Sequence, residues 1–206
     1  MRTFAGKKRN EHKRRIRPLM IMVAEGENVT EQQYFNWFRS PDSPYTIIFH
    51  KAGHVTDPAG LMESVEKRWV EEDGSSEDGD LCYVILDLDC DQKKAEQIRG
   101  LQSKSSVASF IVSNPCIEIW FLLHFQYTTH FFANGKSLIR ELRKFVPGYK
   151  KDMDVYPALK EMTSVAIENS KKLTEFFEED RYSWPDVRCN PWTDVWKMVE
   201  RLKSLR

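Results

Sequence analysis

Tyr83-Val-Ile-Leu-Asp87-Leu-Asp89-Cys-Asp91 is an apolar run that ends in alternating acids, and Met20-Ile-Met-Val-Ala-Glu25-Gly-Glu27 repeats this arrangement earlier in the chain. Both runs have the length and composition of a buried strand. In an open α/β sheet, the ligand site lies at the carboxyl ends of the strands. Converging carboxylates repel one another unless a hard cation lies among them. The two acidic ends therefore predict a cation site at one edge of a sheet.

Segments with strand character alternate with segments of helical period. Strands are predicted at 19–24, 45–49, 81–86 and 107–112, and helices begin near 30, 58 and 92. Thr30-Glu-Gln-Gln33 has the spacing of a capping box, and from Pro115 onward the pattern is wholly helical. This order favours an α/β fold with a Rossmann-like, mainly parallel four-stranded sheet layered by helices, followed by additional C-terminal helices.

Charge divides the chain into a basic arm, residues 1–17, and a single domain, residues 18–206, of which 115–206 is the largely helical C-terminal part. The 206 residues carry no formal net charge, but the arm holds eight Lys or Arg against one acid. Such an arm can contact the phosphates of a nucleic acid, or it can be a solvated tail. The predicted nucleic-acid contacts are Lys7, Lys8, Arg9, Lys13, Arg14, Arg15 and Arg17.

No apolar run is long enough to span a bilayer, and the one that follows the arm leads straight into Glu25 without a small-residue cleavage site. We therefore expect a cytoplasmic protein with no membrane partner. The four cysteines form no C-x-x-C pair and lie in or beside apolar segments. This placement favours reduced core thiols over disulfides or zinc ligands.

Asp87 and Asp89 are the first candidate metal ligands. A strand has a period of two, so both side chains would point to one face about 7 Å apart, and Asp91 can extend the row. Magnesium takes one or two protein carboxylates and keeps several waters. The alternative is a helix N-cap plus exposed loop acids. Glu25 is predicted to be a ligand or an acid–base group, whereas Glu27 can equally complement the dipole of the following helix.

The segment after the fourth predicted strand contributes Glu118, the only acid in an apolar helix. Buried acids persist when they are paired or metal-bound, so we count Glu118 as a catalytic candidate. Asn114 and Pro115 have the residue types of a helix cap and a first helical position. His124 is either a further catalytic group or a core histidine with satisfied hydrogen bonds.

Glu25-Gly-Glu27-x-x-Thr30-Glu31, Asp87-x-Asp89 and Ser113-Asn-Pro-Cys-Ile-Glu118-Ile-Trp-Phe-Leu-Leu-His124-Phe together resemble the RloB-like family, a branch of the Toprim superfamily. Asn190-Pro-Trp-Thr193-Asp-Val-Trp-Lys-Met-Val resembles that family's last helix. The resemblance implies a general acid–base or metal-binding role for Glu25, Mg²⁺ (or Mn²⁺) on the D-x-D, and phosphodiester chemistry on DNA or RNA. It further implies a nuclease of bacterial anti-phage defence, sometimes with an ATPase partner protein.

Two other functions are compatible with this sequence. No tyrosine stands where a topoisomerase nucleophile would be expected, so hydrolysis is the economical reaction. A phosphatase or phosphotransferase of the haloacid dehalogenase type also uses a D-x-D, but on its first strand. A non-catalytic module that binds nucleic acid or a partner could use the aromatic residues Trp184, Trp192 and Trp196.

Overall fold

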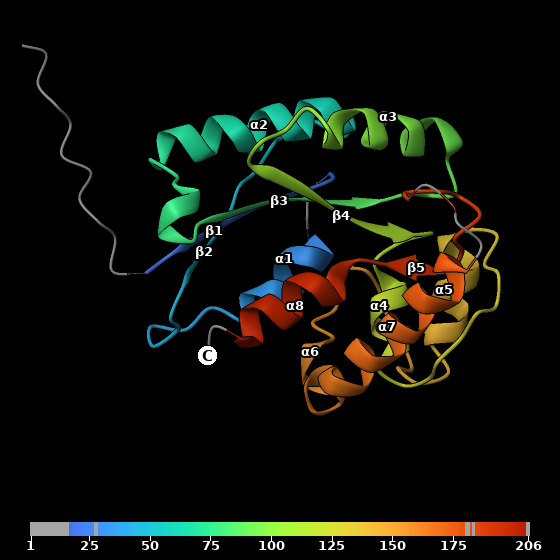
Figure 1. Ribbon diagram of the computed structural model, residues 1–206. Helices are drawn as coiled ribbons and strands as arrows, with labels where there is room; N and C mark the ends of the chain where they lie inside the picture. Colours follow the sequence, from blue (N-terminus) through green and yellow to red (C-terminus); the bar gives the residue numbers. More distant parts are fainter. Residues whose placement is uncertain (1–16, 27–28, 180–181, 183, 205–206) are drawn as a thin grey trace, which may run out of the picture.

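A computed structural model describes residues 17–26, 29–179, 182 and 184–204 of the chain (Figure 1). Arg17 is therefore the one predicted nucleic-acid contact of the arm that lies within the described residues. Glu27 also lies outside them.

The protein is built on a five-stranded, mostly parallel sheet, with the strand order β2-β1-β3-β4-β5. All pairs among the first four strands are parallel, and β5 runs antiparallel to β4. The chain moves from β1 to β2 on one side of β1 and returns to β3 on the other side. The strands are β1 (Leu19–Ala24), β2 (Thr46–Phe49), β3 (Leu81–Asp87), β4 (Ala108–Asn114) and β5 (Trp192–Thr193).

Helices cover both faces of this sheet (Figure 1). The alternation of strand side chains makes two cores: Leu19, Ile21 and Val23 of β1 pack on one face, and Met20 and Met22 pack on the other. The first face is covered by α2 (Pro58–Glu71) and α3 (Gln92–Gln102). The second is covered by α1 (Val29–Asn36), α4 (Glu118–Leu123), α5 (Gly135–Leu142), α6 (Tyr156–Leu159), α7 (Thr163–Glu178) and α8 (Val195–Ser204), with short 3₁₀ turns at Ser76–Asp78 and Lys160–Met162.

The sequence-based fold is confirmed as a mixed α/β, Rossmann- or Toprim-like arrangement, with one correction to the sheet. The segment after Pro115 is not wholly helical, because β5 adds a fifth strand to the four that were predicted. Two residues are too few for a period-two pattern to be visible in the sequence.

Two predicted helix caps are also wrong. Thr30 lies inside α1, and its hydroxyl donates to the carbonyl of Lys151 at 2.5 Å instead of capping the helix. Asn114 is the last residue of β4, and its side-chain amide donates to the carbonyls of Val187 and Cys189. Both polar side chains therefore form tertiary contacts between distant segments.

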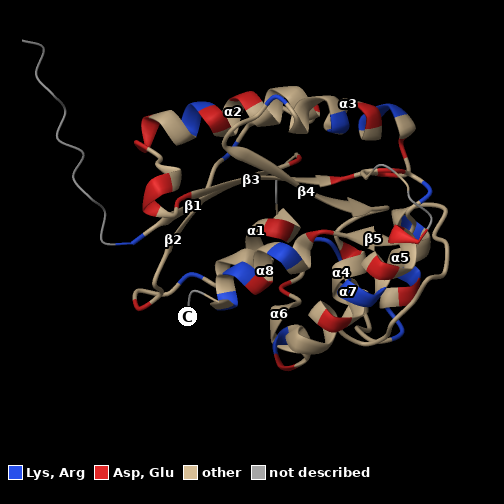
Figure 2. Ribbon diagram, viewed as in Figure 1, with Lys and Arg blue, Asp and Glu red and all other residues tan. Residues whose placement is uncertain are grey.

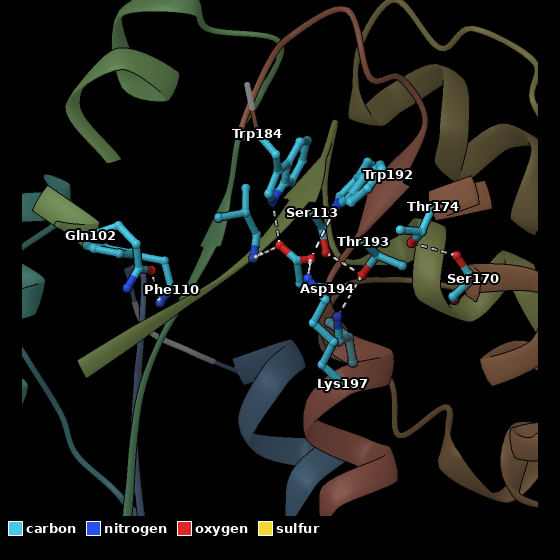
Figure 3. A network of polar contacts seen from close by, with 12 residues as sticks. Gln102, Phe110, Ser113, Ser170, Thr174, Trp184, Trp192, Thr193, Asp194 and Lys197 are labelled. Carbon is cyan, nitrogen blue, oxygen red and sulfur yellow. Dashed lines mark hydrogen bonds and ion pairs between the residues drawn. The ribbon is translucent and has the colours of Figure 1, made fainter. Parts of the chain in front are cut away.

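The buried carboxylate of Asp194 fixes the last strand and helix to the sheet (Figure 3). It accepts hydrogen bonds from the indole nitrogens of Trp184 at 2.8 Å and Trp192 at 3.2 Å, and from the Lys197 ammonium at 2.7 Å. Next to it, the hydroxyls of Ser113 and Thr193 lie 2.9 Å apart. The two tryptophans are therefore engaged in this network and packed against the core, which weakens their use as a free binding surface.

Acidic and basic side chains alternate along α2 and α3 instead of separating into patches of one sign (Figure 2). Within the residues that the structure describes, no helix has the length and apolar character needed to cross a membrane.

Candidate metal centre

A cleft of about 410 Å³ opens at the carboxyl ends of β1 and β3. These neighbouring strands flank the point where the chain reverses its direction across the sheet, which is where open α/β folds bind ligands. Five acidic residues line the cleft: Glu25, Glu31, Asp87, Asp89 and Asp152. The structure therefore brings the acidic ends of the two quoted runs together and adds Glu31 from α1.

The D-x-D does not follow strand geometry. Asp87 is the last residue of β3, and Asp89 and Cys90 have φ angles of +55° and +58°. The chain thus leaves the sheet in a left-handed turn, and the expectation of two aspartates alternating along a strand is wrong. Two consecutive non-glycine residues in this region are strained, and such strain persists where the surroundings enforce it.

Hydrogen bonds from the end of β4 and the segment that follows it hold this turn. The backbone nitrogen of Asp89 donates to the carbonyl of Pro115 at 2.9 Å, and that of Cys90 donates to the side chain of Asn114 at 3.3 Å. In return, Asp87 Oδ1 accepts a hydrogen bond from the backbone nitrogen of Ile117 at 2.8 Å. The asparagine-proline segment therefore positions the acidic turn.

Glu118 lies next to Ile117, behind the cleft lining, and is fully buried. Its Oε1 accepts a hydrogen bond from the Tyr149 hydroxyl at 3.1 Å, while its Oε2 has no hydrogen-bond partner among the described residues. Ligand atoms of Glu118, Asp87 and Cys116 all lie within 4.8 Å of one another. A buried carboxylate oxygen without a partner is costly, and a cation beside it would remove that cost.

Several acidic side chains lie close together in the cleft, and burial together with their mutual repulsion shifts their pKa values. Burial raises the pKa of Asp87 well above its ordinary value, and the charges of Glu31 and Glu118 raise it further. Burial also raises the pKa of Glu31 to about 7, with Glu118 adding to the effect. Burial lowers the pKa of Lys151, but Glu118, Asp87 and other acidic neighbours outweigh burial, so the net pKa of Lys151 is raised. The carboxylates therefore attract positive charge into the cleft.

Lys94, from the first turn of α3, already supplies one positive charge. Its ammonium lies 2.6 Å from Glu25 Oε2 and 3.5 Å from Asp89 Oδ2. Of the predicted metal ligands, Asp87 thus belongs to the compact group with Glu118, whereas Glu25 and Asp89 are joined through a lysine.

The donor set fits a hard divalent cation. Burial raises the pKa of the Cys116 thiol well above its ordinary value, with Glu118 and Asp87 contributing, so the thiol is protonated in the metal-free protein. The remaining donors are carboxylate oxygens, which are the ligands that Mg²⁺ and Mn²⁺ prefer. Asp87 and Glu118 would hold such an ion.

Three predicted site residues lie away from this group. Asp91 is the exposed N-cap of α3 and accepts from the backbone nitrogens of Lys93 and Lys94. The buried ring of His124 contacts Trp120, and its Nδ1 lies 2.9 Å from that residue's carbonyl. Arg17 precedes β1, so it lies at the amino ends of the parallel strands, opposite the cleft. There it donates to the carbonyl of Pro41.

Sequence reasoning missed four charged residues that lie at the site: Glu31, Lys94, Lys151 and Asp152. Glu31 belongs to the segment that resembles the RloB-like family, but the capping-box pattern indicates a structural role for this stretch instead of a site role. Lys151 lies in a loop that docks on α1, where its carbonyl accepts from Thr30 and the neighbouring Asp152 carbonyl accepts from Gln33. No local pattern marks a lysine that reaches its site through a tertiary contact.

Comparison with known proteins places the chain in a family. The family model described as RloB-like protein matches residues 20–202, which is most of the chain. No curated protein and no solved structure matches it. The match includes most of β1 and of α8, together with the acidic turn and the asparagine-proline segment. The chain therefore belongs to the RloB-like family.

Proposed function

We propose that this protein is a metal-dependent nuclease that hydrolyses phosphodiester bonds in DNA or RNA. The observation that carries the proposal is the convergence of five acidic residues on one cleft, with the buried carboxylate of Glu118 behind them. An Mg²⁺ or Mn²⁺ ion held by Asp87 and Glu118 would supply Lewis-acid polarisation of the scissile phosphate. The resemblance to Toprim enzymes supports phosphodiester chemistry over other metal-assisted reactions.

The roles of the side chains follow from their surroundings. Glu25 is held through one oxygen by Lys94, which leaves the other available to orient a water and accept its proton. The water oxygen attacks phosphorus, the phosphodiester P–O bond breaks, and the leaving oxygen takes a proton from solvent. Lys151 faces the cleft and can pair with a phosphate oxygen of the substrate. We include no step for His124, because its ring is buried against Trp120.

The test is a cleavage assay on single- and double-stranded DNA and RNA with Mg²⁺ or Mn²⁺. Asp87→Asn and Glu25→Ala should each lower the cleavage rate by about 100-fold or more. Asp91→Asn is the matched control, because asparagine is as good an N-cap as aspartate and Asp91 does not line the cleft. Equal cleavage by all four proteins would remove the proposed site. A phosphoaspartate trapped at Asp87 would instead support phosphotransfer.

Family resemblance extends the proposal to biology. We propose that cleavage serves bacterial anti-phage defence of the abortive-infection type and that an ATPase partner protein can control it. Cells that express the wild-type protein should resist phage better than cells that express Asp87→Asn at the same level. Protection that survives this substitution would separate defence from the acidic cleft and would favour a binding role.

A further inference from the structure

Lys94 has a position that helix stability does not explain. It lies in the first turn of α3, which contains no acidic residue, and a lysine there faces the positive end of the helix dipole. Its side chain is nevertheless only 12% exposed. The neighbouring Lys93 is exposed, as expected for an ordinary lysine at this end of a helix. Lys94 is therefore placed to serve the cleft.

The contacts of Lys94 divide the carboxylates into two groups. Its ammonium bridges Glu25 and Asp89, at 2.6 Å and 3.5 Å, and compensates their charge. The ligand atoms of Asp87 and Glu118 lie within 4.8 Å of each other, and neither carboxylate forms an ion pair with a lysine in the part of the chain that the structure describes. Lys94 compensates the first group directly, whereas the second group feels the charge of Lys151 without forming an ion pair with it among the described residues.

Asp91 connects the acidic turn to the helical turn that carries Lys94. Asp91 Oδ1 accepts from the backbone nitrogens of Lys93 at 2.8 Å and Lys94 at 3.2 Å, so the start of α3 is fixed to the end of the acidic turn. Displacing the ammonium would leave two cleft carboxylates uncompensated. A divalent ion bound between Glu25 and Asp89 would also meet a positive charge at hydrogen-bond distance from its own ligands.

We propose that Lys94 occupies the position of a second cation, so that the cleft binds one divalent ion per chain where a two-metal nuclease would bind two. This inference rests on the proposed function, which supplies the divalent ion held by Asp87 and Glu118. Two-metal sites hold ions about 3.5–4 Å apart that share carboxylates. Here the ammonium provides the second positive charge and, unlike an exchangeable ion, is always present.

The experiment counts bound Mn²⁺ on the full-length protein by calorimetry and by electron paramagnetic resonance. The wild type should bind one ion per chain. Lys94→Met removes the charge and keeps a side chain of similar length, and this variant should bind two Mn²⁺ ions. The double variant Lys94→Met with Glu25→Gln should again bind one ion. Lys93→Met is the matched control from the same helical turn and should bind one.

The outcomes separate this inference from the proposed function. Two ions on the wild type, or one on Lys94→Met, would overturn the role of Lys94 and leave a metal-dependent nuclease intact. No binding to any of the proteins would contradict the proposed function and the inference with it. If Lys94→Met does not fold, Lys94→Gln and the wild-type count remain decisive, because two ions on the wild type overturn the inference without any variant.

Discussion

Glu31→Gln should stabilise the metal-free protein at alkaline pH. Burial is the main reason that the pKa of Glu31 rises from its ordinary value of 4.5 to about 7 in the folded protein. Between these values the folded state holds a proton that the unfolded state has lost. The stabilising effect of the neutral carboxyl is therefore complete below pH 4.5 and is lost as the pH rises through 7. Glutamine has the same shape and stays neutral.

The size of the effect follows from the two pKa values. Ionising a carboxyl whose pKa has moved from 4.5 to about 7 lowers the free energy of unfolding by up to about 3 kcal/mol. Glu31 is partly exposed, so water screens some of this repulsion, and we expect about 2 kcal/mol at pH 8. At pH 4 both forms are neutral in the folded protein, and the variant and wild type should differ by less than about 0.5 kcal/mol.

Urea unfolding followed by tryptophan fluorescence at pH 4, 6 and 8, with EDTA present, measures this difference. Glu63→Gln, an exposed change on α2, should leave the free energy of unfolding unchanged at every pH. A Glu31→Gln protein that is no more stable than wild type at pH 8 would refute the electrostatic account of the cleft. The same gain at pH 4 and pH 8 would attribute the effect to packing.

Three further predictions concern stability. Burial lowers the pKa of His124 from 6.5 to about 4, so the free energy of unfolding of the wild type should fall by up to about 3 kcal/mol between pH 7 and pH 4. His124→Gln should lose less over this range, and parallel curves of unfolding free energy against pH would contradict this. Asp194→Ala leaves buried indole donors unpaired and should cost about 3 kcal/mol in urea unfolding, whereas a loss below about 1 kcal/mol would contradict its anchoring role. Mn²⁺ at 100 times its dissociation constant should stabilise the wild type by about 2.7 kcal/mol, which is measured as a higher melting temperature. Asp87→Asn should show no such rise, and an equal rise in both proteins would place the ion elsewhere.

The strands and the acidic ends were predictable because their signals are local. An apolar run followed by acids identified β1 and β3, and parallel order then made Glu25 and Asp87 neighbours. The left-handed turn at Asp89 was not predictable, since hydrogen bonds from the segment after β4 enforce it. Lys151 reaches the cleft only because its loop docks on α1, a contact between residues 121 positions apart. Long-range contacts of this kind leave no periodic pattern.

The strained turn at Asp89 and Cys90 also ties the cleft to the completion of folding. Asn114 joins this turn to the segment before β5 through the carbonyl of Cys189, and the amide of Asn190 donates to the sulfur of Cys90 at 3.3 Å. The acidic turn thus acquires its full set of supports only after residues near 190 have packed against it. During synthesis, a chain that has not yet emerged as far as β5 would lack the geometry for metal-assisted chemistry. Such an arrangement would delay the proposed cleavage of nucleic acid until the domain is finished.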